Sequence, residues 1–169
     1  MATYTHLSPS PLGNILLSAD DTGLTGLWFE NQKYYAAGLG SDIVNVKACS
    51  EHPIFTQAKQ WLNLYFEGSE PKFTVPMHLT GTDFQKEIWQ LLLEIPYGET
   101  TTYGTLAKIY AQKHGCSHMC AQAVGSAVGH NKISILVPCH RVLGAGGSLT
   151  GYAGGLDKKK RLLLLEGVL

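Results

Sequence analysis

Alternating apolar and polar residues dominate the first thirty positions of the chain. Three such stretches, 3–7, 14–19 and 24–29, are separated by the segments 11–13 and 20–23, which contain proline, glycine and aspartate. Alternation with a period of two is typical of half-buried strands, and these residue types between strands favour tight turns. The pattern therefore predicts a small antiparallel sheet.

A helical pattern follows the predicted sheet. It begins at Pro53, a residue suited to a first helical position, and ends at Gly68. The apolar residues that recur at helical spacing are Phe55, Ala58, Trp61, Leu62 and Tyr65. One amphipathic helix is therefore expected to pack on the sheet. The next stretch has turn residues and little periodicity, so we place a boundary there, between a structural domain at 1–77 and a second domain at 78–169.

Three further helices are predicted in the second domain. The first begins at Thr82, which can form a capping box with Gln85. Thr102 is the expected N-cap of the second helix, and the third is expected over residues 117–129. Two short helices joined by a glycine-containing turn are typical of a helix-turn-helix, although most such pairs are simple helical hairpins. The predicted fold class is α+β, with a mostly helical C-terminal domain.

Composition and charge narrow the function classes. The chain has 169 residues, 44% of them hydrophobic, which is enough to bury one substantial core or two small ones. Its net charge is zero, but residues 1–81 carry four Lys and Arg against seven Asp and Glu, whereas residues 82–169 carry nine against six. A polyanionic partner is therefore expected to meet the second half.

The sequence favours a cytoplasmic protein. It has no apolar run of membrane-spanning length, and residues 1–14 lack a charged start followed by an apolar segment, so neither a membrane partner nor a secretory signal is expected. The four cysteines are too few and too scattered for a disulfide framework in a chain of this size. They suit a reducing compartment.

The most informative motif is the run 137–141, Val-Pro-Cys-His-Arg, which follows an apolar stretch at 133–136. Proline lacks an N–H and restricts the residue before it, so a short strand entering this run is expected to end in a rigid turn at Cys139. Adjacent residues of a strand point to opposite faces, so a bridging water between Cys139 and His140 is favoured over a direct pair. The alternative is a buried core cysteine beside a structural histidine.

The stretch from Gly129 to Val142, with Gly151–Gly155 and Leu165–Gly167 downstream, resembles the O6-alkylguanine-DNA alkyltransferases. The resemblance is dense from about residue 82 onward. It implies direct-reversal DNA repair, in which an alkyl group moves irreversibly from O6-alkylguanine to Cys139, once per molecule and without a cofactor. Whether O4-alkylthymine is also a substrate stays open.

The resemblance also assigns roles around Cys139. It implies that His140 takes the thiol proton through a water, that Glu166 orients the imidazole, and that Asn131 holds the turn by hydrogen bonds. Tyr103, or a backbone amide near it, is expected to supply a proton to the departing guanine. Taken alone, Glu166 would be an ordinary exposed carboxylate at a helix end.

Double-stranded DNA containing O6-alkylguanine is the implied partner, bound by a monomer, with the third helix of the second domain in the minor groove while the target base leaves the stack. The residues expected to meet the DNA or the flipped base are Gln122, Ser126, Arg141, Tyr152, Ala153 and Gly154. Members of the family usually have arginine where this chain has Gln122, and some have serine where it has Ala153. We therefore expect weaker DNA binding or slower base flipping.

Other interpretations stay open. A non-catalytic binder of alkylated DNA would lack the cysteine, and a cysteine hydrolase would act repeatedly on a small ester or peptide. The alternating residues His114, Cys116, His118 and Cys120 match no common zinc module, so no metal site is expected. The basic run 158–161 is expected to be a solvated helix face, with phosphate contact as its alternative.

Overall fold

The computed structural model describes residues 2–169 and divides them into two compact units. The first unit contains the chain up to Thr80 together with Lys132–Ser134, and the second contains Gly81–Asn131 and Ile135–Leu169. The structure thus divides the chain in the turn-rich stretch in which we placed a boundary, although the return of Lys132–Ser134 to the first unit gave no signal in the sequence. The roles assigned to the two domains remain predictions.

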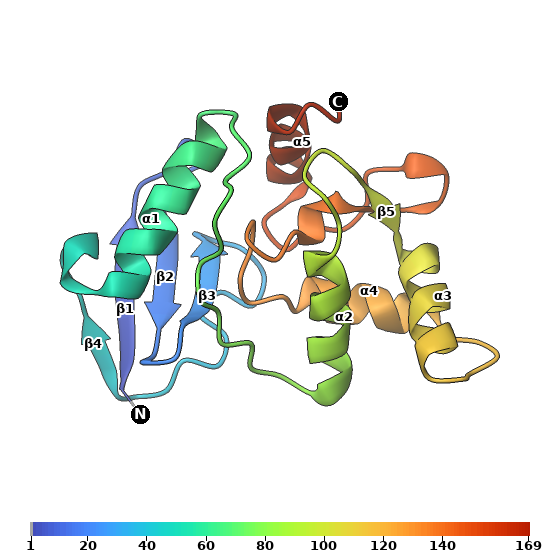
Figure 1. Ribbon diagram of the computed structural model, residues 1–169, viewed down its shortest axis with the longest axis horizontal. Coiled ribbons are helices and arrows are strands. Elements are labelled where there is room, and N and C mark those ends of the chain that lie inside the picture. Colours follow the sequence, from blue (N-terminus) through green and yellow to red (C-terminus); the bar gives the residue numbers. More distant parts are fainter. Residues whose placement is uncertain (1) are drawn as a thin grey trace. The chain divides into compact units, whose positions relative to one another are not determined.

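The first unit is built on a four-stranded sheet with the order β3-β2-β1-β4 (Figure 1). Its strands are β1 (Thr3–Ser8), β2 (Ile15–Ala19), β3 (Leu24–Phe29) and β4 (Ile43–Asn45). The first three pair antiparallel, which confirms the predicted sheet, and β4 pairs parallel to β1. Strand β4 was not predicted, because its three residues are all exposed and give no alternation.

One helix, α1 (Pro53–Phe66), packs on β2 and β3 and confirms the prediction for this segment. It follows a short 3-10 turn, η1 (Cys49–Glu51), and has proline at its start. The His52 side chain caps it by accepting a hydrogen bond from the Ile54 N–H at 3.2 Å. Four of the five predicted apolar positions are fully enclosed, namely Phe55, Ala58, Leu62 and Tyr65.

The second unit is mostly helical and contains one small sheet (Figure 1). Its helices are α2 (Asp83–Leu93), α3 (Tyr103–Lys113), α4 (Ala121–Gly129) and α5 (Leu156–Leu165), with 3-10 turns η2 (Cys139–Arg141) and η3 (Ala145–Gly147). Strands β5 (Thr101–Thr102) and β6 (Val142–Leu143) pair parallel. The predicted α+β class is therefore confirmed. Among the described helices, none has both the length and the apolar character that a membrane span requires.

The helix starts in this unit follow local side-chain chemistry. Thr82 Oγ1 accepts the Gln85 N–H at 3.1 Å, and Gln85 Oε1 accepts the Thr82 N–H at 3.1 Å. Thr102 Oγ1 likewise accepts the Thr105 N–H at 3.1 Å. Both predicted caps are confirmed, because each satisfies backbone donors that a helix start leaves without partners within the helix.

Two local predictions are wrong. Helix α4 begins at Ala121 and not near residue 117, because the chain leaves α3 through Gly115 in the left-handed region (φ 65°) and forms a loop up to Cys120. No strand leads into Cys139 either. Ile133 makes only an isolated bridge with Leu27, after which Ile135, at φ 71°, turns the chain out of extended geometry.

Trp89 of α2 forms a hydrogen bond with α4, and replacing it tests how much the packing of these two helices contributes to stability. Its indole N–H donates to the Ala127 carbonyl at 2.9 Å, and the side chain is almost fully buried. We expect Trp89→Phe to lower the free energy of unfolding by about 1–3 kcal/mol, because a buried acceptor loses a donor and the ring becomes smaller. The measurement is urea unfolding followed by circular dichroism.

The matched control is Trp61→Phe, at a half-buried tryptophan that stacks on Tyr65 with ring centroids 5.3 Å apart. It removes an indole with less burial, so its cost should be smaller. Equal destabilisation by the two substitutions would contradict the importance assigned to the Trp89 contact.

Candidate active site

Cys139 begins the 3-10 turn η2, directly after Pro138. The turn is closed by two backbone hydrogen bonds, from the Cys139 N–H to the Val137 carbonyl at 2.8 Å and from the Arg141 N–H to the Pro138 carbonyl at 3.0 Å. Cys139 is only 5% exposed. The thiol is therefore held in a buried, rigid turn, as expected from the proline, but at the start of a helical turn and not at the end of a strand.

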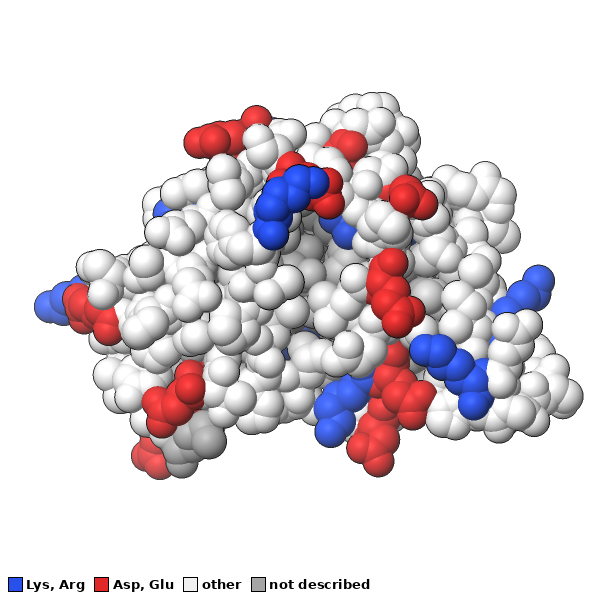
Figure 2. Space-filling view, viewed as in Figure 1, with Lys and Arg blue, Asp and Glu red and all other residues white. Residues whose placement is uncertain are grey.

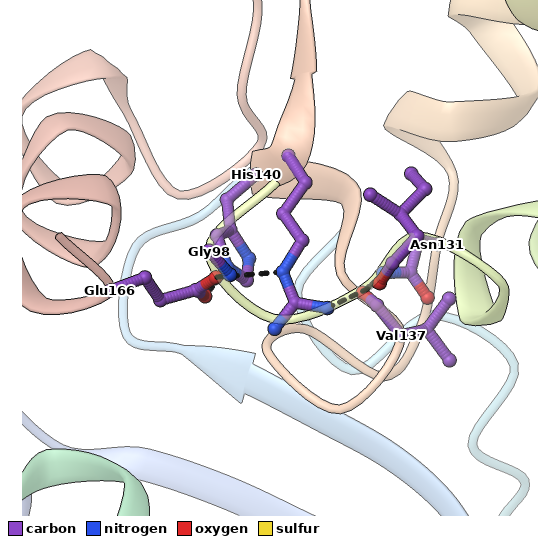
Figure 3. Close-up of polar contacts among 7 residues, drawn as sticks. Gly98, Asn131, Val137, His140 and Glu166 are labelled. Carbon is purple, nitrogen blue, oxygen red and sulfur yellow. Dashed lines mark hydrogen bonds and ion pairs between the residues drawn. The ribbon is translucent and has the colours of Figure 1, made fainter. Parts of the chain in front are cut away.

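The Asn131 side chain contacts this turn on both sides of Pro138. Its Nδ2 donates to the Val137 carbonyl at 2.9 Å and to Cys139 Sγ at 3.3 Å, and Figure 3 shows Asn131 beside Val137. Asn131 is itself only 4% exposed. An N–H that donates to sulfur favours the thiolate, so this amide both shapes the turn and stabilises the reactive form of the thiol.

The Glu166 carboxylate has three hydrogen-bond partners, two of them in the cysteine turn. Its Oε2 lies 2.5 Å from His140 Nε2, and its Oε1 accepts from Arg141 Nε at 2.8 Å and from the Gly98 N–H at 3.1 Å. Glu166, Gly98 and His140 lie close together in Figure 3. The carboxylate is fully buried, which removes the alternative of an exposed helix-end residue.

Burial sets the protonation states of the cysteine and the histidine. It raises the pKa of the Cys139 thiol, against the opposing effect of the Asn131 hydrogen bond. It lowers the pKa of His140, against the opposing effect of Glu166. Both groups are therefore neutral at rest. Because the His140 Nε2–H points to Glu166, Nδ1 is the nitrogen that can accept a proton.

Arg141 lies inside the protein, which corrects the prediction that it meets DNA. Its side chain is 9% exposed, and its guanidinium donates to Glu166 and, from Nη1, to the Ile95 carbonyl at 2.7 Å. The Tyr97 ring covers it, with the guanidinium carbon 5.7 Å from the ring centroid. A buried carboxylate needs a compensating charge, and Arg141 supplies it for Glu166.

Gln122 and Ser126 lie on the exposed face of α4, one helical turn apart. The opposite face is buried through Val124, Ala127 and Val128. Both predicted DNA-contacting residues of this helix are thus accessible to a ligand. The surface drawn in Figure 2 is mostly uncharged, with Lys and Arg lying among Asp and Glu, in keeping with the zero net charge.

Tyr103 is the first residue of α3 and joins three parts of the second unit. Its ring lies against Gly125 of α4, where an added Cβ would sit 3.7 Å from the ring. Its hydroxyl donates toward the carbonyls of Thr150 and Gly151 at 3.3 and 3.5 Å. Burial, and then the nearby Cys139, raise its pKa, so the phenol stays protonated. The half-buried residues 152–154 continue from these carbonyls.

Sequence reasoning missed Lys159. Within the basic run that was expected to be solvated, Lys160 and Arg161 are exposed but Lys159 is fully buried. Its ammonium donates to the carbonyls of Val142, Thr150 and Gly151 at 2.5, 2.8 and 3.0 Å. A signal existed, because helical spacing puts Lys159 on the face of Leu162, Leu163 and Glu166.

The alternating histidines and cysteines lie at the end of α3 and in the loop that follows it. His114 Nε2 lies 2.6 Å from Glu87 Oε2, and its ring stacks on Tyr110 with centroids 4.3 Å apart. Among the described residues, no group of three or more His, Cys, Asp or Glu side chains is arranged to hold a metal ion. Cys116 and Cys120 are free and exposed.

Two family models match the chain. The model described as 6-O-methylguanine DNA methyltransferase, ribonuclease-like domain, matches residues 3–79, and the one described as 6-O-methylguanine DNA methyltransferase, DNA binding domain, matches residues 83–168. The two matches together span nearly the whole chain.

Curated relatives and solved structures agree with these models. The methylated-DNA–protein-cysteine methyltransferase of Methanosarcina acetivorans is 43% identical over 164 residues, covering 97% of this chain and 98% of the relative. The protein of the same name from Haemophilus influenzae is 40% identical, covering 99% of this chain and 88% of the relative. The crystal structure of Mycobacterium tuberculosis OGT in complex with DNA has a TM-score of 0.82 at 40% identity, covering 96% and 92% of the two chains.

The Asn131 contact with sulfur predicts how the thiol titrates. Replacing Asn131 with leucine removes the hydrogen bond that lowers the pKa of Cys139 and leaves the burial that raises it. The pH midpoint for alkylation of Cys139 by iodoacetamide should therefore move to higher pH. Peptide mass spectrometry across a pH series measures it, with Asn63→Leu at an exposed asparagine as the control. An unchanged midpoint in Asn131→Leu would count against the contact.

Proposed function

Because this chain belongs to the 6-O-methylguanine DNA methyltransferase family, we propose that Cys139 is the residue that accepts the alkyl group from O6-alkylguanine in double-stranded DNA. The protein is a methylated-DNA–protein-cysteine methyltransferase that acts in direct-reversal DNA repair. The observation that carries the residue assignment is the buried Cys139 thiol, contacted by Asn131 and followed by a histidine bound to Glu166.

DNA reaches this site through the exposed face of α4. O6 of guanine lies within the stacked duplex, so the target nucleotide must rotate into the protein, at a cost of a few kcal/mol of stacking and pairing. Gln122 and Ser126 are accessible to meet the duplex, and the small residues of α4 permit close approach of a backbone. The base then enters beside a wall of the site that Tyr103 forms with residues 150–154.

The transfer breaks one bond and forms one. His140 accepts the Cys139 proton through a water, and Glu166 stabilises the resulting imidazolium against the repulsion of the nearby Arg141 charge. Sulfur attacks the alkyl carbon, the bond from that carbon to O6 breaks, and its electron pair leaves with guanine. Tyr103, kept protonated by its raised pKa, supplies a proton to the departing base. The products are a thioether at Cys139 and an unmodified guanine.

The product explains the single turnover. The C–S bond of the thioether does not break under these conditions, because a thiolate leaves an alkyl carbon poorly, and the step consumes the only thiol that the mechanism uses. Each molecule therefore repairs one base, and the reaction needs no cofactor. We propose that the protein acts as a monomer, and a cytoplasmic location stays a prediction.

The decisive experiment is intact-mass and peptide analysis after incubation with excess duplex containing O6-methylguanine. We expect one added methyl group per protein, on Cys139, and none in Cys139→Ala. A wild-type protein that binds the lesion but stays unmodified would overturn the assignment and favour the non-catalytic lesion binder. Repeated turnover on a small ester would instead favour a cysteine hydrolase.

The exposed Gln122 predicts a gain of affinity. Gln122→Arg adds a positive charge on the face of α4 that we propose meets DNA, so binding to the alkylated duplex should tighten about tenfold at low salt. Fluorescence anisotropy at several salt concentrations measures it. Gln90→Arg, which adds the same charge on an exposed position of α2, is the control and should have a smaller effect. Equal gains from the two variants would show that Gln122 has no special position.

A further inference from the structure

The ammonium of Lys159 is fully enclosed by the second unit, beside the site but outside the proposed chemistry. It has three hydrogens, and three backbone carbonyls accept them, those of Val142, Thr150 and Gly151. The first carbonyl belongs to β6, directly after the cysteine turn, and the other two belong to the glycine-rich segment. One side chain thus fastens this segment to the strand that follows Cys139.

Tyr103 approaches the same two carbonyls from α3. Its hydroxyl lies 3.3 and 3.5 Å from the Thr150 and Gly151 oxygens, and the Lys159 nitrogen lies 5.9 Å from the centre of its ring. Gly151 is packed close to it, because an added Cβ would lie 3.4 Å from the Tyr103 hydroxyl. The two peptide groups are therefore held by a cation and a phenol at once.

Stability alone does not account for a lysine at this position. Burial lowers the pKa of Lys159 to about 8, so the enclosed charge opposes folding. An apolar side chain of similar volume would avoid this cost. The segment that Lys159 holds contains Gly144, Gly146, Gly147, Gly151, Gly154 and Gly155, a composition that costs much conformational entropy to order.

The hydrogen bonds also orient the wall. In a trans peptide the N–H points opposite to the C=O, and the described chain contains no cis peptide bond. With the Thr150 and Gly151 carbonyls directed at Lys159, the N–H groups of Gly151 and Tyr152 are directed away from it. They belong to the part of the wall that leads into residues 152–154.

We propose that Lys159 is a positioning residue for alkyl transfer, whose ammonium holds the Thr150 and Gly151 peptides so that they form a fixed wall with Tyr103 beside Cys139. The role of this wall in alkyl transfer rests on the proposed function, whereas the contacts that hold the wall do not. Loss of the ammonium releases the wall without removing any group that reacts, so it slows transfer more than it weakens DNA binding.

The test compares Lys159→Met with Lys160→Met, which removes the same charge from the exposed side of α5. Hydrogen exchange with mass spectrometry measures the segment 144–155. We expect exchange there to quicken about tenfold in Lys159→Met and to stay at the wild-type rate in Lys160→Met. Single-turnover transfer at saturating O6-methylguanine duplex should slow at least about tenfold in Lys159→Met, while the Kd for that duplex changes by less than about twofold.

Each failure has a separate signature. If the proposed function is wrong, wild-type protein transfers no methyl group, and the exchange data still decide whether Lys159 orders the wall. Unchanged exchange in Lys159→Met overturns the proposal, even if the thiol becomes less reactive, because the effect would then be one of charge alone. Lys159→Gln keeps two N–H donors and serves as a second variant. Hydrogen exchange in the segment 144–155 should be slower in Lys159→Gln than in Lys159→Met. Where Lys159→Met does not fold, exchange in Lys159→Gln should stay near the wild-type rate.

Discussion

The buried carboxylate of Glu166 is the interaction on which the second unit depends. Three segments that are distant in sequence meet at its two oxygens, the loop after α2 through Gly98, the cysteine turn through His140 and Arg141, and the end of α5 itself. Burying this carboxylate without partners would lower the stability of the fold by several kcal/mol. Its donors must therefore all be in place for it to stay buried. The group that fixes the histidine for chemistry is thus the same group that closes the fold.

Lys159 is a second buried charge in this unit, but it is a cation where Glu166 is an anion. Carbonyl oxygens surround a cation there, as N–H groups surround an anion at Glu166. Lys159 lies in α5 and Glu166 is the residue that caps its C-terminal end, so one helix positions both charged groups against the cysteine turn and the strand that follows it. Rigid positioning of the thiol follows from these two groups, because neither can shift without exposing or unpairing a buried charge.

The sequence predicted features that depend on nearby residues better than features that depend on residues far along the chain. The caps at Thr82 and Thr102 and the strands β1, β2 and β3 depend on neighbours a few residues away, so pattern alone was sufficient. It was not sufficient for β4, whose three exposed residues show no alternation. The chemistry at Cys139, His140 and Glu166 came from the resemblance of a motif to a family. Burial of Arg141 and Lys159 depends on carbonyls far along the chain, at Ile95 and Val142, which no local pattern contains. The expected strand before Cys139 failed because a left-handed residue, Ile135, followed a single bridge.

The enclosed and protonated state of Cys139 has a consequence for the protein's lifetime. Cells contain many small electrophiles and oxidants, and these react with exposed thiolates at rates set by access and ionisation. A thiol that is 5% exposed and has a raised pKa escapes most of them. Because each molecule can be used once, alkylation of Cys139 by a stray electrophile would inactivate it permanently. Its low resting reactivity therefore keeps the supply of active protein matched to the number of damaged bases, and not to the oxidative state of the cell.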